Sequence, residues 1–197
     1  MFLAEPPHSP AVDARYDEER ASDGYVGNNT RAWCYRPDVM TGYVDLQARL
    51  VSESTLTERE RAILVAATAG AMSDSYCALA WGARLARLAG EGVAAAVIGD
   101  TTVDTLAPRE AALAHWARTV TRDPNATTPA DVDELRAAGL TDREIFEATT
   151  FIALRVAFST VDSAVGAQPD HQLAAATPPA VRAAVTFGRP PAASPSL

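Results

Sequence analysis

The chain has 197 residues, of which 48% are hydrophobic and 21% are charged, as is ordinary for a folded protein with a buried core. Its net charge of −8 and its isoelectric point near 4.8 exclude the basic surface that a nucleic-acid-binding protein needs. The longest nearly apolar stretch, 62–72, is too short to span a bilayer, and the N-terminus lacks the pattern of a signal peptide. We therefore expect a cytoplasmic protein that binds neither nucleic acid nor a membrane.

The residues that bind metals are few and scattered. Two cysteines, Cys34 and Cys77, lie far apart in the sequence, which excludes a disulfide framework and a cysteine-rich zinc site. The three histidines, His8, His115 and His171, have no spacing that is typical of a ligand pair. We expect no metal and no cofactor.

Residues 1–36 are expected to form an N-terminal arm. They contain several prolines and the turn-rich stretch DGYVGNNT at 23–30. The aromatic cluster RAWCYRP at 31–37 indicates that the arm packs on the rest of the protein.

Apolar spacing and capping residues predict helices in the rest of the chain. Thr57 with Glu60, and Thr141 with Glu144, have the spacing of a capping box. No segment shows the sustained alternation that is typical of a strand, so the predicted fold class is all-α. The expected helices cover 37–51, 56–72, 76–88, 91–100, 106–123, 128–139, 141–165 and 179–186.

One short motif recurs at the start of three of these helices. The stretches are LTERE (56–60), LAPRE (106–110) and LTDRE (140–144). Their unequal offsets exclude a solenoid repeat. We interpret the motif as favourable helix N-terminal chemistry that is used three times.

Two long stretches carry a resemblance to a known family: LTERERAILVAATAGAMSDSYCALAWG (56–82) and the segment from LAPREAALAHWARTVTRD to TVDSAVGA (106–167). They resemble the carboxymuconolactone decarboxylase family, in its alkylhydroperoxidase D-like, peroxidase-related branch. The resemblance implies an alkylhydroperoxidase D-like helical bundle that assembles as a homo-oligomer, with a trimer or hexamer favoured and a dimer next. The implied organisation is an N-terminal arm (1–36), a carboxymuconolactone decarboxylase-like helical domain (37–168) and a Pro/Ala-rich C-terminal tail (169–197).

The resemblance also locates the family's thiol relay. Redox-active members carry a Glu on one helix, a Cys-x-x-Cys at the start of the next helix and a His one turn later. The two thiols form a disulfide while Glu and His relay protons. In this sequence the four positions hold Ala62, Asp74, Cys77 and Trp81, so one thiol of the relay remains.

The candidate site residues are Cys77, Asp74 and Tyr76 as catalytic groups and Trp81 as a substrate-binding platform. If Asp74 is the N-cap, its carboxylate accepts the backbone N–H of Cys77. The adjacent carboxylate and burial both raise the thiol pKa, which predicts a neutral thiol at pH 7. Structural alternatives stay open, with Cys77 as a small core residue, Asp74 as a cap only and Trp81 as a core aromatic.

Three functions follow as hypotheses. The resemblance implies an antioxidant, peroxidase-type oxidoreductase that acts on a peroxide or a small organic molecule. The residues allow a non-redox lyase or isomerase-like enzyme that uses Asp74 in the same pocket. A non-catalytic binding or structural oligomer is the third.

Overall fold

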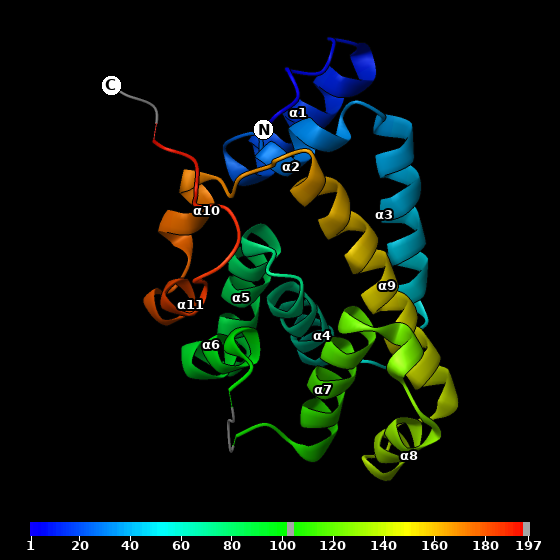
Figure 1. The fold of residues 1–197 in the computed structure, drawn as a ribbon. Helices are drawn as coiled ribbons and strands as arrows, with labels where there is room; N and C mark the ends of the chain where they lie inside the picture. Colours follow the sequence, from blue (N-terminus) through cyan, green and yellow to red (C-terminus); the bar gives the residue numbers. More distant parts are fainter. Residues whose placement is uncertain (102–104, 195–197) are drawn as a thin grey trace.

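The computed structural model describes residues 1–101 and 105–194, and every regular element in that part of the chain is a helix (Figure 1). The predicted all-α fold is therefore confirmed. The elements are α1 (Pro10–Asp23), α2 (Asn28–Trp33), α3 (Pro37–Ser52), α4 (Glu58–Ala71), α5 (Ser75–Ala89), α6 (Glu91–Gly99), α7 (Pro108–Arg122), the short 3₁₀ helix η1 (Pro124–Ala126), α8 (Pro129–Ala137), α9 (Asp142–Ala164), α10 (His171–Ala176) and α11 (Pro179–Ala184).

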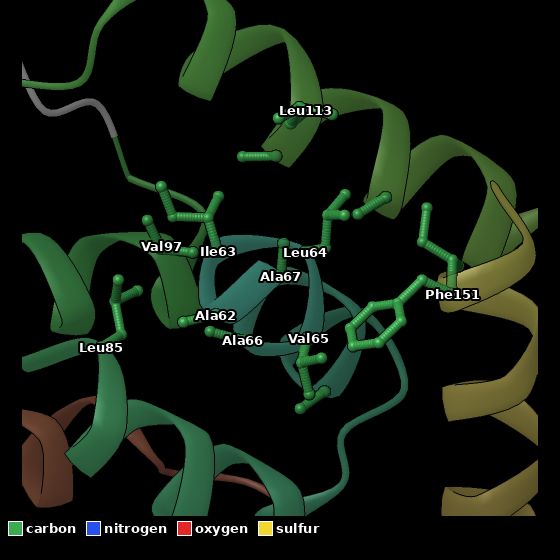
Figure 2. Packing of buried hydrophobic residues seen from close by; sticks show 14 of the residues in the cluster. Ala62, Ile63, Leu64, Val65, Ala66, Ala67, Leu85, Val97, Leu113 and Phe151 are labelled. Carbon is green, nitrogen blue, oxygen red and sulfur yellow. The ribbon is translucent and has the colours of Figure 1, made fainter. Parts of the chain in front are cut away.

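Helix α4 runs through the centre of the fold and contacts α5, α6, α7 and α9. Its side chains from Ala62 to Ala67 are each at most 1% exposed. Figure 2 shows this run surrounded by Leu85 of α5, Leu113 of α7 and Phe151 of α9. Because α4 is covered on every side, its sequence is apolar all round instead of showing one apolar stripe.

The two predicted capping boxes are both present. Thr57 accepts a hydrogen bond from the backbone N–H of Glu60 (3.2 Å), and the Glu60 carboxylate accepts one from the backbone N–H of Thr57 (2.7 Å). Thr141 and Glu144 exchange the same two bonds at the start of α9. These bonds satisfy backbone donors that the first helical turn leaves free, and they fix where α4 and α9 begin.

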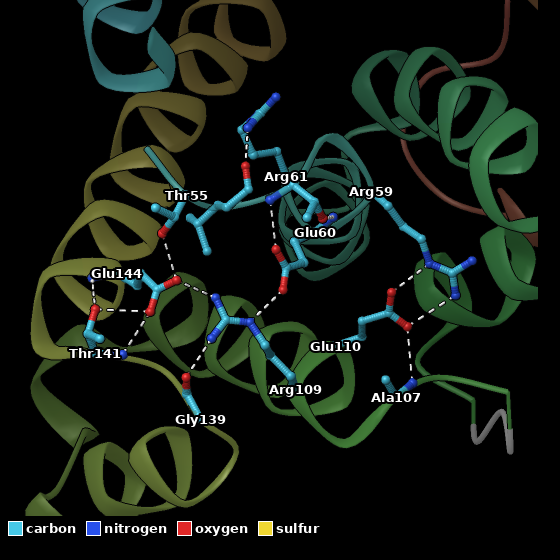
Figure 3. A network of polar contacts seen from close by, with 12 residues as sticks. Thr55, Arg59, Glu60, Arg61, Ala107, Arg109, Glu110, Gly139, Thr141 and Glu144 are labelled. Atoms are coloured by element: carbon cyan, nitrogen blue, oxygen red, sulfur yellow. Dashed lines mark hydrogen bonds and ion pairs between the residues drawn. The ribbon is translucent and has the colours of Figure 1, made fainter. Parts of the chain in front are cut away.

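The recurring Arg-Glu motif joins three helix N-termini to one another (Figure 3). Arg59 donates to both carboxylate oxygens of Glu110, at 2.6 and 3.1 Å. Arg109 donates to Glu60 and to Glu144, each at 2.6 Å. The motif therefore does more than cap single helices, because the arginine of one copy binds the capping glutamate of another.

The N-terminal arm contains two helices that the sequence analysis did not predict. Helix α1 starts at the N-cap Ser9 and ends at Gly24, whose φ of +82° is the left-handed conformation that glycine favours. Its sequence is strongly polar, which hides the helical period. Trp33, at the end of α2, stacks on Phe158 of α9 with ring centroids 4.9 Å apart, so the predicted packing of the aromatic cluster is confirmed.

The C-terminal segment also packs on the body of the protein. Helix α11 corresponds to the helix expected at 179–186, whereas α10 was not predicted. Val181 of α11 is fully buried, and α11 contacts α5 and α6. Residues 195–197 of the predicted tail lie outside the described residues, and the division into arm, domain and tail stays a prediction.

Helix α3 lies beside α9 at one edge of the molecule (Figure 1). Val39, Val44 and Leu46 on this helix are 45%, 45% and 50% exposed. Exposed apolar side chains that gather on one helix are compatible with an interface. The homo-oligomer stays a prediction.

Candidate active site

Asp74 is held at the turn between α4 and α5. The preceding residue, Ser73, has a φ of +55°, and the backbone N–H of Asp74 donates to the carbonyl oxygen of Ala69 (2.9 Å). Asp74 Oδ1 accepts the backbone N–H of Cys77 at 3.2 Å. Asp74 is therefore the N-cap of α5, as the sequence predicts, and this bond leaves its second oxygen available for other contacts.

Cys77 lies in the first turn of α5 and is 2% exposed. The hydroxyl of Ser159 on α9 donates to its Sγ at 3.4 Å. Burial raises the pKa of the Cys77 thiol far above its usual value, and the negative charge of Asp74 raises it further. The charge of Arg155 and the Ser159 hydroxyl act in the opposite direction but do not overcome burial. Cys77 is thus a neutral thiol at physiological pH.

Helix α9 supplies charged groups to the site that the sequence analysis missed. The Arg155 guanidinium lies 5.1 Å from the ring centre of Trp81, and Asp162 Oδ1 accepts the indole N–H of Trp33 at 3.0 Å. Arg155 and Asp162 are 7% and 1% exposed. The sequence does contain an indication of this part of the site. Residues 155, 159 and 162 are polar and share one face of a helix that is otherwise apolar there.

Asp162 has an unusual charge environment. Burial and the nearby charge of Asp74 raise the pKa of Asp162 to about 7, against the lowering effects of the Trp33 hydrogen bond and of Arg155. Carboxyl groups whose pKa values are strongly shifted cluster at functional sites.

Three polar atoms of this cluster have no hydrogen-bond partner in the described part of the chain: Asp74 Oδ2, Asp162 Oδ2 and Arg155 Nε. Buried polar atoms are nearly always satisfied in folded proteins, so such exceptions need an explanation. Their position around one buried thiol makes this cluster the candidate site.

A groove of about 330 Å³ gives access to Asp74. Its lining residues include Ser73 of the turn, Ser75 of α5, Ser163 of α9 and Arg189 of the C-terminal segment. A larger cavity of about 440 Å³ lies between α1 and α3. We favour the smaller groove as the site because Asp74 is one of its lining residues.

The structure places Tyr76 in a different hydrogen-bond network. The Tyr76 hydroxyl donates to the carboxylate of Asp170 and lies 2.8 Å from the side-chain oxygen of Asn29. Burial and the charge of Asp170 raise the Tyr76 pKa. This hydroxyl therefore contacts α2 and the N-cap residue of α10. The predicted catalytic role of Tyr76 stays a prediction.

Trp81 lies one turn beyond Cys77 and is half-buried. Arg84 and Arg155 lie over its ring, with their guanidinium carbons 5.0 and 5.1 Å from the ring centre. A tryptophan ring that two cations approach is already engaged in cation–π contacts. Its predicted role as a substrate platform stays a prediction.

The remaining relay positions hold no replacement for the missing groups. Ala62 is buried in the α4 core, and Glu60, the nearest glutamate on that helix, is bound to Arg109. Cys34 lies in a small apolar cluster with Val12, Tyr16 and Val26. Within the described residues both cysteines are free thiols.

The described residues lack two further kinds of feature. No group of three or more His, Cys, Asp or Glu side chains in residues 1–101 and 105–194 is arranged to hold a metal ion. No helix in the same ranges is long and apolar enough to cross a membrane.

The reactivity of Cys77 should match a buried neutral thiol. In a Cys34→Ser background, we expect a disulfide reagent at pH 7.5 to modify Cys77 at least about tenfold more slowly in the folded protein than in denaturant, because access and the thiolate fraction are both low. The measurement is the rate of thiol release against pH. A folded protein that reacts as fast as the unfolded chain would contradict this description of the thiol.

The sequence matches no model of a protein family and no curated protein. Among solved structures it is similar to an uncharacterised peroxidase-related protein from Ralstonia eutropha JMP134, described as an alkylhydroperoxidase AhpD core (TM-score 0.72, 23% identity, 87% of this chain and 93% of that one). It is also similar to an uncharacterised peroxidase-related protein from Silicibacter sp. TM1040 (TM-score 0.74, 21% identity, 86% of this chain and 92% of that one).

A third similar structure is a cysteine-to-alanine variant of the debrominase Bmp8 in complex with 2,3,4-tribromopyrrole (TM-score 0.73, 15% identity, 89% of this chain and 96% of that one). At these identities the similarity concerns the fold. The resemblance that the sequence carries is confirmed at that level: the chain has the all-helical fold of the alkylhydroperoxidase AhpD core.

Proposed function

We propose that this protein is a non-redox enzyme of the lyase or isomerase type, which removes a proton from a small organic molecule bound in the groove at Asp74. One observation carries the proposal. Asp74 lines the groove, and its Oδ2 is buried and has no hydrogen-bond partner in the described residues. A carboxylate oxygen in this state can accept a proton from a bound molecule.

The surrounding groups suit this role. The N–H of Cys77 holds Oδ1 of Asp74 at 3.2 Å, which fixes the direction of Oδ2. Because the Cys77 thiol is neutral, it places no second negative charge beside Asp74. The helix N-terminus of α5 stabilises the ionised carboxylate. Cys77 is therefore a positioning residue in this proposal.

The proposed step is a simple proton transfer. Asp74 takes a proton from a carbon next to a carbonyl group, and the electron pair of the C–H bond moves into the carbonyl to give an enolate. Return of the proton to another carbon gives an isomer, whereas loss of a leaving group from the enolate gives an elimination product. The 330 Å³ groove is of a size for a small molecule, and the similar debrominase structure holds a small organic ligand.

The second candidate is a peroxidase-type oxidoreductase. The contact between Ser159 and the Cys77 thiol favours it, as does the similarity to proteins named peroxidase-related. Such an enzyme needs a thiolate and a resolving thiol, whereas the Cys77 pKa is raised and Asp74 stands at the position of the family's other cysteine.

Deuterium exchange tests the proposal without knowledge of the full reaction. The protein is incubated in D₂O with a panel of 2-oxo acids, 3-oxo acids and small lactones, and NMR follows the loss of the proton next to the carbonyl. We expect exchange above the buffer rate for at least one compound. Exchange with none of them, in a folded protein, would favour the non-catalytic alternative.

A further inference from the structure

The second buried carboxyl group of the site, on Asp162, has no part in the proton transfer described above. It is 1% exposed, and Asp74 is 4% exposed. Each of the two carboxyl groups has one oxygen fixed by an N–H donor: Trp33 binds Oδ1 of Asp162 at 3.0 Å, and Cys77 binds Oδ1 of Asp74 at 3.2 Å. In each, Oδ2 is buried and has no partner among the residues that the structure describes.

We propose that Asp74 and Asp162 form an electrostatically linked carboxyl pair, in which Asp162 is the member that retains a proton. Two carboxyl groups in one buried site do not ionise independently, because like charges repel and little water screens them, so one of the two retains its proton to higher pH. The proposal rests on the proposed function for its catalytic meaning: Asp162 is a positioning residue that keeps the charge on the group that faces the groove.

The assignment of the proton to Asp162 follows from the two environments. Asp74 caps a helix, where backbone N–H groups favour a negative charge, and it is one of the residues that line the groove. Asp162 lies in the middle of the packed helices and has one neutral indole donor. Desolvation disfavours the charged form of the more enclosed group, so the proton belongs there.

The other groups around Asp162 do not change this assignment. Arg155 on the same helix favours the charged form, and Tyr43 of α3 is near enough for its own pKa to respond to Asp162. Helix α2 contributes Trp33 and α5 contributes Asp74. The raising effects of burial and of the Asp74 charge are larger than the lowering effects of Arg155 and of the Trp33 hydrogen bond, so the pKa of Asp162 is raised to about 7.

Trp33 provides a reporter for this proton, because its indole N–H is bound directly to Asp162. Replacing Trp81 and Trp116 with phenylalanine leaves Trp33 as the single tryptophan. We expect its fluorescence to show one transition with a midpoint near pH 7 as Asp162 ionises. The Asp162→Asn variant should abolish the transition, and Asp74→Asn should move its midpoint to lower pH by removing the neighbouring negative charge.

Each outcome of this titration decides the proposal. A transition that persists in Asp162→Asn, or a midpoint that Asp74→Asn leaves in place, would overturn the carboxyl pair. A midpoint below about pH 5 in the single-tryptophan protein would mean that Asp162 is an ordinary carboxylate. If Asp162→Asn does not fold, the midpoint in the single-tryptophan protein and its shift in Asp74→Asn still decide. No substrate is needed, so failure of the exchange assay and failure of the pair are separate results.

Thermal unfolding gives a second measurement of the protonation of Asp162. The pKa of Asp162 is higher in the folded protein (about 7) than in an unfolded chain (about 3.9). Its contribution to stability is therefore fully present below about pH 4 and is lost as the pH rises to about 7. We expect the melting temperature of the unsubstituted protein to fall across this window relative to that of Asp162→Asn. Parallel curves for the two proteins would overturn the assignment of the proton to Asp162.

Discussion

Replacing Arg109 with alanine is expected to lower the free energy of unfolding by about 3 kcal/mol and the melting temperature by about 10 °C. Arg109 binds Glu60 and Glu144, whose side chains are 9% and 11% exposed. Removing the arginine leaves two partly buried carboxylates without their shared cation, at the point where α4, α7 and α9 begin. Chemical denaturation followed by circular dichroism measures the effect.

A matched control is the replacement of Arg136 with alanine. Arg136 also binds two carboxylates, Asp133 and Asp142, but its side chain is 49% exposed and theirs are 70% and 73% exposed. Exposed ion pairs contribute little to stability, so we expect the free energy of unfolding to fall by less than about 1 kcal/mol. If the free energy of unfolding fell equally in the two variants, the Arg109 network would contribute no more to stability than a surface ion pair does.

The pH dependence of the Arg109 network has a definite sign. Partial burial alone would raise the pKa of Glu144, but hydrogen bonds from Arg109, Thr141 and Thr55 lower it to about 2. The pKa is thus depressed in the folded state, so the stabilisation is present above the unfolded pKa of about 4.3 and is lost as the pH falls toward 2. The difference in stability between the unsubstituted protein and Arg109→Ala should shrink over this range.

The Asp74→Asn variant is expected to reduce proton exchange at least about 100-fold, the usual contribution of a positioned general base. The amide oxygen of asparagine still accepts the N–H of Cys77, and asparagine is as good an N-cap as aspartate. Stability should therefore change by less than about 1 kcal/mol, which separates loss of the base from loss of the fold.

Asp170→Asn is the control for this variant. Asp170 is also a buried carboxylate at the start of a helix, but it binds Tyr76 and the backbone N–H of Asn28. The exchange rate per folded molecule should be retained in Asp170→Asn. An exchange rate that survives in Asp74→Asn would remove the basis of the proposed function.

Local sequence signals predicted the helices of the body and the cap at Asp74. The capping boxes at Thr57 and Thr141 depend on residues three positions apart, which a sequence displays directly. Helix α1 was missed because only Val12 and Tyr16 of its fourteen residues are buried, too few to show a period. Its cap residues, Ser9 and Gly24, were the available signal.

The parts of the site that could not be predicted depend on long-range contacts. Trp33 and Asp162 are 129 positions apart, and Ser159 and Cys77 are 82 positions apart. No local pattern indicates that these side chains meet, because their proximity comes from the packing of α2, α5 and α9. The partner of the Tyr76 hydroxyl, Asp170, lies 94 positions away and was missed for the same reason.

Peroxide consumption in the presence of a dithiol tests most directly whether Asp74, and not thiol chemistry at Cys77, defines this site. The unsubstituted protein, Cys77→Ser and Cys34→Ser are compared at equal folded concentration. Because the Cys77 pKa is raised and Asp74 stands at the position of the second thiol, we predict turnover that is barely above the reagent background and unchanged by Cys77→Ser. Robust turnover that is abolished in Cys77→Ser would contradict the account, and its loss in Cys34→Ser as well would identify Cys34 as the resolving thiol.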